Sequence, residues 1–166
     1  MPEPPRAKDP IRPTDNDARA LAWSLIDSAR FGALGVIDPE THGPMVTRIA
    51  IVPGTDGLPM TLISTLSSHT AALDANPICS LLLGEPGAKG DPLTHPRLTL
   101  QARAEPADKV ALKAHYLGHY PKARLYYDFT DFRLIRFAPL AGLLNGGFGK
   151  AFRLTPDDLN RDRGAR

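Results

Sequence analysis

Residues 97–105 alternate between apolar and polar side chains more regularly than any other part of the chain. The apolar positions are Leu98, Leu100, Ala102 and Ala104, and arginine, threonine and glutamine stand between them. Because successive side chains of a β-strand point to opposite faces, this pattern predicts a strand with one face in the core and the other in solvent. A half-buried strand of this kind favours a mainly β fold.

Shorter apolar runs, separated by turn sequences, supply the remaining strands. We expect these strands at 33–37, 45–52, 58–65, 78–83, 132–137 and 141–144, the last two divided by Pro139. The turn clusters between the first three runs are short, which favours hairpin connections and antiparallel neighbours. Six or more mostly antiparallel strands with helices at their edges predict a closed or partly closed β-barrel.

Helices are expected between and beyond these strands. The first opens at 14–17, where a threonine is followed three residues later by an acid, and it ends at Gly32. The second spans 67–75. A third is expected to begin at Pro106 and end at Gly118, and Thr155 to cap a final turn. The apolar face of the third helix would consist of Val110, Ala111, Ala114 and Leu117.

The 166 residues fit one domain, which we place at 14–159. The first ten residues contain four prolines and have little to bury, so a disordered tail is expected over 1–13. Residues 160–166 are mostly charged or polar, and we expect them to form a solvated tail.

The single cysteine and the modest charge argue against several classes of protein. Cys79 has no intrachain disulfide partner, and its apolar neighbours predict a buried structural thiol, which suits a reducing cytoplasm. The sequence has no signal-peptide pattern and no apolar run near the ~20 residues that span a membrane. A net charge of +2 is too small to indicate nucleic-acid binding, although it can help to hold one anionic ligand. We therefore expect a cytoplasmic protein with neither a membrane nor a nucleic-acid partner.

Five hydroxyl side chains and a histidine lie between an expected strand end and an expected helix start. They are Ser64, Thr65, Ser67, Ser68, His69 and Thr70. A helix N-terminus offers free backbone N–H groups and a partial positive charge, so an anion can bind there. The alternative is that Ser67 or Ser68 only caps the helix, but one cap needs one hydroxyl and five are present.

Arg48 is a second candidate for anion binding, because it lies inside the expected strand at 45–52. An unpaired charge facing a barrel wall is costly, whereas a guanidinium beside the hydroxyl cluster would bind a phosphate through two hydrogen bonds. The alternative is an arginine on the solvent face of an amphipathic strand.

Five segments, in this order along the chain, resemble the pyridoxamine 5′-phosphate oxidase-like FMN-binding split-barrel superfamily, and within it the HugZ-like haem-utilisation branch. They are VTRI at 46–49, ISTLSSHT at 63–70, CSLLLGE at 79–85, HPRLTLQ at 95–101 and LNGGFG at 144–149. The resemblance covers residues 21–159, which makes it more specific than any single motif. It implies a split β-barrel, a homodimer and an FMN held between the subunits.

The resemblance also implies roles for individual residues. The positions that hold the FMN phosphate match Arg48, Ser68, His69 and Thr70. The positions along the ribityl chain and the ring match Ser64 and Thr65. Gln101 matches a position near the isoalloxazine ring, where a donor to N1 or O2 stabilises the charge that develops on reduction. A glycine-rich turn near the site matches Asn145, Gly146, Gly147 and Phe148.

The sequence departs from the family pattern at two points. Pyridoxamine oxidases carry more basic residues at the helix start than the Ser-His-Thr found here, which puts a pyridoxamine substrate in doubt. Haem-degrading members continue into a further C-terminal segment that supplies the haem ligand. This sequence ends at Arg166, so we expect that segment to be absent.

Three other patterns give weaker signals. His115 and His119 have the spacing of two metal ligands on one helix face, but no third ligand is evident, so no metal site is expected. The segment 84–90 lacks the spacing of a phosphate loop and favours a mobile loop over the barrel mouth. A contact between Lys89 and a ligand is the less favoured alternative. Asp128 and Asp131 lie among aromatic residues, which favours a solvated turn over a catalytic pair.

These observations leave three functions open. The first is an FMN-dependent oxidoreductase acting on a small or planar substrate, in which the flavin carries the hydride and the protein orients the reactants. The second is a haem-binding or haem-degrading protein with His42, His69 or His95 as axial ligand. The third is a non-catalytic flavin-binding or dimeric interaction module.

Overall fold

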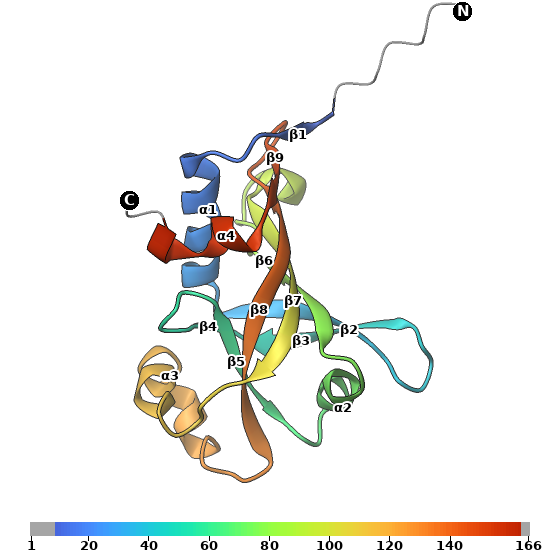
Figure 1. Ribbon diagram of the computed structural model, residues 1–166, viewed down its shortest axis with the longest axis vertical. Helices are drawn as coiled ribbons and strands as arrows, with labels where there is room; N and C mark the ends of the chain where they lie inside the picture. The colour runs from blue at the N-terminus through green and yellow to red at the C-terminus, as the bar shows by residue number, and fades with distance from the viewer. Residues whose placement is uncertain (1–8, 164–166) are drawn as a thin grey trace, which may run out of the picture.

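The computed structural model describes residues 9–163 and consists of a strongly curved sheet with helices at its margins (Figure 1). The strands are β1 Ile11–Arg12, β2 Phe31–Ile37, β3 Pro44–Ala50, β4 Val52–Pro53, β5 Pro59–Ser64, β6 Ile78–Leu83, β7 Arg97–Pro106, β8 Phe132–Asn145 and β9 Ala151–Leu154. The α-helices are α1 Asn16–Ser28, α2 Ser68–Ala75, α3 Lys113–His119 and α4 Pro156–Leu159. Short 3₁₀ turns are η1 Pro92–Thr94, η2 Pro121–Leu125 and η3 Arg161–Arg163.

The sheet follows the order β1-β9-β8-β7-β6-β2-β3, and β5 joins it through β8. Every pairing is antiparallel except that of β1 with β9. The sheet curves without closing, which confirms the expected mainly β, split-barrel fold. Among residues 9–163, no helix is both long enough and apolar enough to cross a membrane.

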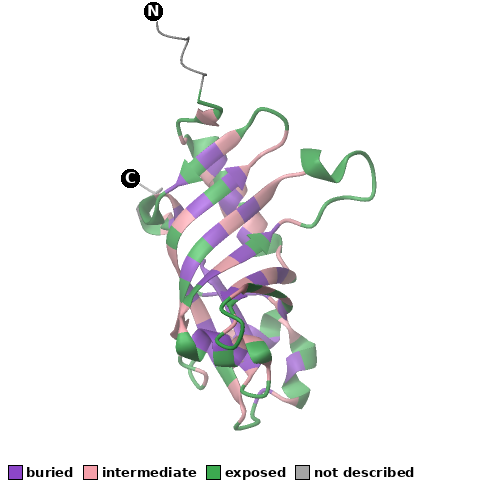
Figure 2. Cartoon of the chain, turned by 90° about the vertical axis from the view of Figure 1, so that its right-hand side faces the viewer, coloured by how far each residue is buried: buried purple, intermediate pink, exposed green. Residues whose placement is uncertain are grey.

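The alternating segment forms β7, as its sequence predicts, and it continues one residue further to Pro106. Leu98, Leu100 and Ala102 are completely buried, while Gln101 and Arg103, on either side of Ala102, are exposed. The same alternation of buried and exposed residues is visible along the neighbouring strands (Figure 2). One face of the sheet is therefore core, and the other is available for contacts.

Two hydrophobic clusters form the core. The larger cluster joins α1 to the inner face of the sheet through residues such as Ile26, Leu34 and Leu81. The smaller cluster packs α3 against β5 and β8, with Tyr116 and Tyr127 at its centre. In Figure 1, α1 and α4 accordingly lie along one side of the sheet, and α3 lies at its lower end.

The C-terminal strand differs from the prediction because Pro139 does not interrupt it. β8 runs continuously from Phe132 to Asn145 and spans most of the length of the molecule (Figure 1). Pro139 pairs with Ala102 at an irregularity between Gln101 and Ala102, where the register shifts. A residue at a bulge is not required to donate a hydrogen bond to the neighbouring strand, so proline, which has no backbone N–H, is tolerated there.

The prediction of a helix beginning at Pro106 is wrong about the residue at which the helix starts and about the residues of its apolar face. Pro106 ends β7, and α3 begins only at Lys113. The Asp108 carboxylate accepts hydrogen bonds from the backbone of Val110 and Ala111, at 3.1 and 2.9 Å, and holds this segment in a turn. Val110 is consequently 88% exposed instead of lying on the apolar face of a helix.

The connections after the first hairpin also differ from the expected meander. β2 and β3 form the predicted antiparallel hairpin. The strand expected at 45–52 breaks after Ala50, however, and β5 pairs with β8 rather than with β3. The first helix ends earlier than expected, so that Phe31 and Gly32 already belong to β2.

Both expected tails contain ordered contacts where the structure describes them. Residues 1–8 and 164–166 lie outside the described residues, but Ile11 and Arg12 form β1 beside β9. Arg161 bonds both carboxylate oxygens of Asp27, at 2.9 and 2.7 Å, instead of lying free in a solvated tail. Backbone pairing in β1 and the two-bond ion pair of Arg161 thus order positions whose composition is typical of disorder. The predicted cap at Thr155 is confirmed as a capping box with Asp158.

Candidate functional site

A cavity opens on the outer face of the sheet where β2 and β6 diverge. The two strands pair only from Ala33 to Gly35 on β2, although β2 continues to Ile37 and β6 begins at Ile78. The resulting cavity has a volume of about 460 Å³. This size lies within the range of sites that hold organic cofactors, roughly 300–1,000 Å³.

The cavity walls are mainly apolar and carry a few neutral polar groups. The apolar lining consists of Val36, Ile37, Pro44, Ile78, Cys79 and Leu140. The polar lining consists of Asn76, Ser80 and Gln101, and Gly35 completes the wall. An apolar pocket with a small number of hydrogen-bonding groups is the usual composition of a site for an organic ligand.

Gly35 leaves room for this cavity because it has no side chain. A Cβ atom at this position would lie 3.7 Å from the Ser80 carbonyl oxygen and 3.9 Å from Ser80 Cβ, which are ordinary contacts. A larger residue at position 35 would therefore occupy the cavity without a backbone clash. The glycine in the middle of the apolar run at 33–37 is the sequence signal that points to this cavity.

The cavity lies in a face of the sheet formed by five strands, β3, β2, β6, β7 and β8, on which several large apolar side chains are exposed. Cross-strand pairs place Val46 opposite Gly35, Gly35 opposite Ser80, and Ser80 opposite Gln101, so these side chains share one face. The large apolar side chains exposed on this face are Ile37, Val46, Ile78, Leu82, Leu140 and Leu143. Several large apolar side chains exposed on one face favour a surface that binds a ligand or another protein.

Cys79 takes part in the cavity wall as a neutral thiol. The residue is buried, and its Sγ lies 3.6 Å from the Ala102 carbonyl oxygen, to which the thiol donates. Burial raises the pKa of Cys79 to about 11. The thiol is therefore protonated at neutral pH, in agreement with the structural role expected from the sequence.

Two of the five hydroxyl side chains at the start of α2, those of Ser64 and Thr70, form hydrogen bonds within the protein. The Thr70 hydroxyl donates to the Ser64 carbonyl oxygen at 2.5 Å, and the Ser64 hydroxyl donates to Asp131 at 3.0 Å. The backbone N–H of Thr65 donates to the Asp131 carbonyl oxygen. Ser67 occupies the N-cap position, but its side chain makes no capping hydrogen bond. Asp131 thus fixes the strand end, a role that its sequence context did not indicate.

His69 is the side chain of this segment that reaches the sheet. Its Nδ1 lies 3.0 Å from the Thr47 hydroxyl, and burial lowers the pKa of His69. Ser68 is exposed, and its hydroxyl has no hydrogen-bond partner among the described residues. The exposed part of the helix start therefore consists of Ser68 and the adjoining backbone.

Arg48 lies next to Thr47 on β3, so its side chain points to the opposite face of the strand. Its guanidinium carbon is 5.3 Å from the centre of the Phe31 ring, and no hydrogen bond joins it to the α2 segment within the described residues. The structure thus leaves the cation exposed on the outer face, which it shares with the cavity.

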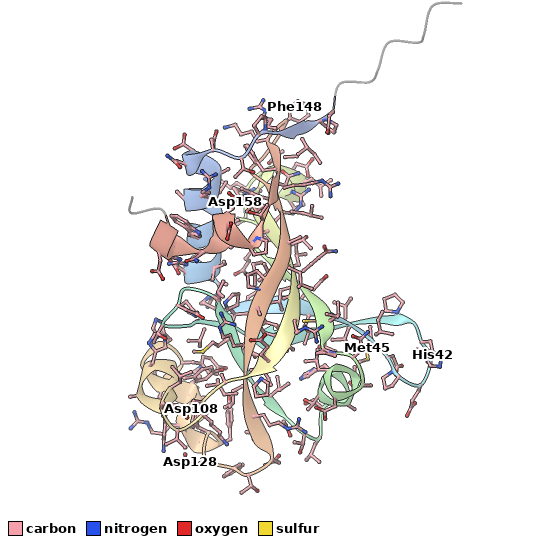
Figure 3. The ribbon with its side chains drawn as sticks, viewed as in Figure 1. His42, Met45, Asp108, Asp128, Phe148 and Asp158 are labelled. Carbon is pink, nitrogen blue, oxygen red and sulfur yellow. The ribbon has the colours of Figure 1, made fainter. Side chains whose placement is uncertain are left out.

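The glycine-rich turn lies at another end of the molecule. Asn145 ends β8 opposite Arg97, and its side-chain oxygen accepts the Gly147 N–H at 3.0 Å. Gly147 has a φ of 115°, and Phe148 is 97% exposed. Figure 3 shows Phe148 near β1, whereas the β2–β3 hairpin with His42 and Met45 projects to the side. The turn and the cavity are not brought together within one chain.

The weaker sequence patterns have structural explanations. The rings of His115 and His119 are 4.6 Å apart, but the described residues contain no group of three or more metal-ligating side chains. His95 holds the loop at 84–95, because its two ring nitrogens contact the Gly87 N–H and the Lys89 carbonyl oxygen at 3.1 and 2.8 Å. Asp128 forms an exposed ion pair with Lys113, apart from Asp131.

Comparisons with known proteins agree with this fold. No protein-family model matches the chain. The non-canonical heme oxygenase HOZ, chloroplastic, of Arabidopsis thaliana is 31% identical over 135 residues, which cover 78% of this chain and 40% of the relative. A heme binding protein from Mycobacterium smegmatis is 25% identical and superposes with a TM-score of 0.78, over 90% of this chain and 61% of that one.

A third comparison extends the likeness in fold beyond haem proteins. A protein related to general stress protein 26 from Clostridium acetobutylicum, of the pyridoxinephosphate oxidase family, superposes with a TM-score of 0.65 at 18% identity. The match covers 88% of this chain and 99% of that one. The chain spans about two fifths of the curated relative from Arabidopsis, so that protein's activity does not transfer directly.

Proposed function

We propose that the chain, which has the fold of the pyridoxamine 5′-phosphate oxidase-like split barrels, binds haem, a planar tetrapyrrole, in a homodimer. The binding site is the opening between β2 and β6. The observation that carries the proposal is the apolar cavity of about 460 Å³ within an exposed apolar face.

The composition of the cavity suits a large apolar ring with polar edges. Ile37, Ile78 and Leu140 offer surface against which a macrocycle packs, and burial of apolar area is the main source of binding energy for such a ligand. Ser80 and Gln101 offer neutral hydrogen bonds at the ring edge. The haem proteins among the relatives support this choice of ligand.

A second copy of the chain is the proposed cover for this surface. Val46 is 68% exposed, and Leu82, Leu140 and Leu143 are each more than 40% exposed. Leaving such a surface in water is unfavourable, and a two-fold dimer would bury it together with the open side of the cavity. A dimer would thus place the ligand between subunits.

FMN is the second candidate ligand, favoured by the exposed cation at Arg48. Arg48 on β3 and Gln101 on β7 share the outer face of the sheet. Two strands, β2 and β6, lie between β3 and β7, so these two strands are about 14 Å apart across the sheet. An extended ligand with a phosphate at one end and a ring at the other can bridge this separation. The bound flavin would supply hydride transfer, and the chain would then be an oxidoreductase in the cytoplasm, as the lone thiol Cys79 suggests.

Titration of the purified protein with haem, and separately with FMN, tests the two candidates. Gly35→Leu fills the cavity, and Gly118→Leu is a matched control because a Cβ atom at Gly118, on α3, meets nothing within 4 Å. We expect saturable haem binding by the wild type and by Gly118→Leu, with at least about tenfold weaker binding by Gly35→Leu. Equal binding by all three proteins would refute this site.

The substitution Arg48→Ala tests the hypothesis that the chain binds FMN. If Arg48 holds the phosphate, this substitution weakens FMN binding much more than riboflavin binding, and equal losses would refute the role. If FMN is retained, reduction by NAD(P)H then tests for oxidoreductase activity. Binding of neither haem nor FMN by a folded dimer would favour the non-catalytic interaction module.

A further inference from the structure

The cavity lacks a side chain that can serve as a strong iron ligand. Protein ligands to haem iron are histidine, cysteine thiolate, methionine and tyrosine. The ten residues that line the cavity include neither a histidine, a methionine nor a tyrosine, and the one cysteine, Cys79, is protonated and bonded to Ala102. The cavity walls are thus suited to a macrocycle but contain no side chain that can ligate its iron.

All five histidines of the chain lie in the described residues, and none of them lines the cavity. Both ring nitrogens of His95 are engaged in the loop at 84–95. His115 bonds the Pro53 carbonyl oxygen at 2.7 Å, and His119 contacts the carbonyl oxygen of His115 at 3.0 Å. Both of these residues belong to α3, which packs at the lower end of the sheet (Figure 1).

The two remaining histidines lie on the β2–β3 side of the molecule, outside the cavity wall. His69 is held through Nδ1 by Thr47, whose side chain points to the inner face of β3, away from the face that carries the cavity. His42 is exposed in the β2–β3 turn, with a φ of 57° (Figure 3). Neither residue directs a nitrogen into the cavity lining.

We propose that the cavity recognises the tetrapyrrole ring rather than its metal, so that the chain binds metal-free porphyrin about as tightly as haem. The proposal rests on the proposed haem function and names the wider ligand class of the same site. Recognition comes from the apolar walls around Gly35 and from the neutral polar groups of Ser80, Gln101 and Asn76. Those contacts are identical for the two ligands, because they reach the ring and its edges.

The experiment compares protoporphyrin IX with haem on the same full-length protein, following absorbance for haem and ligand fluorescence for the porphyrin. We expect dissociation constants within about threefold of each other. Gly35→Leu should weaken both ligands by about tenfold or more, and Gly118→Leu should weaken neither. His42→Ala and His69→Ala should leave haem affinity within about twofold of wild type and should leave the position of the Soret band unchanged.

The outcomes separate this inference from the function on which it rests. Haem binding that is about thirtyfold or more tighter than porphyrin binding would show that iron ligation dominates, and would overturn the inference while supporting the haem function. Loss of the bound-haem Soret band in a single histidine variant would likewise overturn the inference and support the haem function. Failure of both ligands to bind the folded wild-type protein would overturn the haem function and the inference together. Circular dichroism of each variant establishes that the fold is intact.

Discussion

Arg161 ties the end of the described chain to α1 and to the turn before β5. Its guanidinium bonds both carboxylate oxygens of Asp27, at 2.9 and 2.7 Å, and donates to the carbonyl oxygens of Gly57 and Trp23, at 3.1 and 3.4 Å. The guanidinium carbon also lies 5.9 Å from the centre of the Trp23 ring. We predict that Arg161→Ala destabilises the fold measurably, although the sequence places this residue in a tail.

The magnitude follows from the contacts that are lost. The ion pair is partly exposed, at 30% for Arg161 and 48% for Asp27, so we assign it about 0.5 kcal/mol. The contact with the Trp23 ring adds about 0.5 kcal/mol. The hydrogen bonds to two carbonyl oxygens add about 1 kcal/mol, because both are longer than ideal. The free energy of unfolding should therefore fall by about 2 kcal/mol, which corresponds to a Tm lower by about 4–8 °C in a domain of this size.

Urea unfolding followed by circular dichroism measures this loss, with Arg133→Ala as the control. Arg133 also forms a two-bond pair, with Asp74 at 2.8 and 3.2 Å, but both partners are about half exposed and neither anchors a chain end. The control should lose at most about 0.5 kcal/mol. Equal losses in the two variants, or a loss below about 0.5 kcal/mol for Arg161→Ala, would refute the reasoning.

Three further predictions follow from particular side chains. Burial raises the pKa of Asp158, but hydrogen bonds from Thr155 and Arg19 outweigh it and hold the pKa below its usual 3.8. The resulting stability is present above that value and is lost as pH falls through the lower folded pKa. Asp158→Asn should therefore lower the free energy of unfolding by about 1 kcal/mol at pH 7 and by less at pH 3. A difference in urea midpoint between wild type and variant that is the same at both pH values would contradict this. Cys79, with its pKa of about 11, should react with a thiol reagent about a hundredfold more slowly in the native protein than in urea. Leu100→Ala, at a completely buried position, should lower the free energy of unfolding by about 3 kcal/mol, whereas a loss under about 1 kcal/mol would show that this core is loosely packed.

The sequence predicts those parts of the fold that depend on neighbouring residues. The strand at 97–105 is correct because its burial alternates with period two, and Thr155 caps α4 because the capping box is local. The length of β8 escapes prediction because tolerance of Pro139 depends on a bulge opposite Ala102, which is distant in sequence. The helix expected at Pro106 fails for a local reason, since Asp108 stabilises a turn that competes with a helix.

The candidate site is less accessible to sequence reasoning than the fold. Arg48 and the α2 start are recognisable as polar residues in unusual places, and Gln101 is identified through the family resemblance. The face that each side chain occupies, however, depends on strand pairing. The cavity itself arises where β2 and β6 part beyond Gly35, an event that neither strand encodes alone. Assignment of ligand contacts therefore needs the three-dimensional arrangement.

The pairing of β5 with β8 affects the order in which the chain can acquire its structure during translation. β5 is almost wholly buried. It pairs with the two-residue strand β4 and with β8, and the ribosome makes β8 only after α2, β6, β7 and α3. Until residue 136 emerges, an apolar strand with an unpaired edge remains on the nascent chain. Completion of the barrel is thus late in synthesis, and the nascent chain has to avoid aggregation through β5 in the meantime.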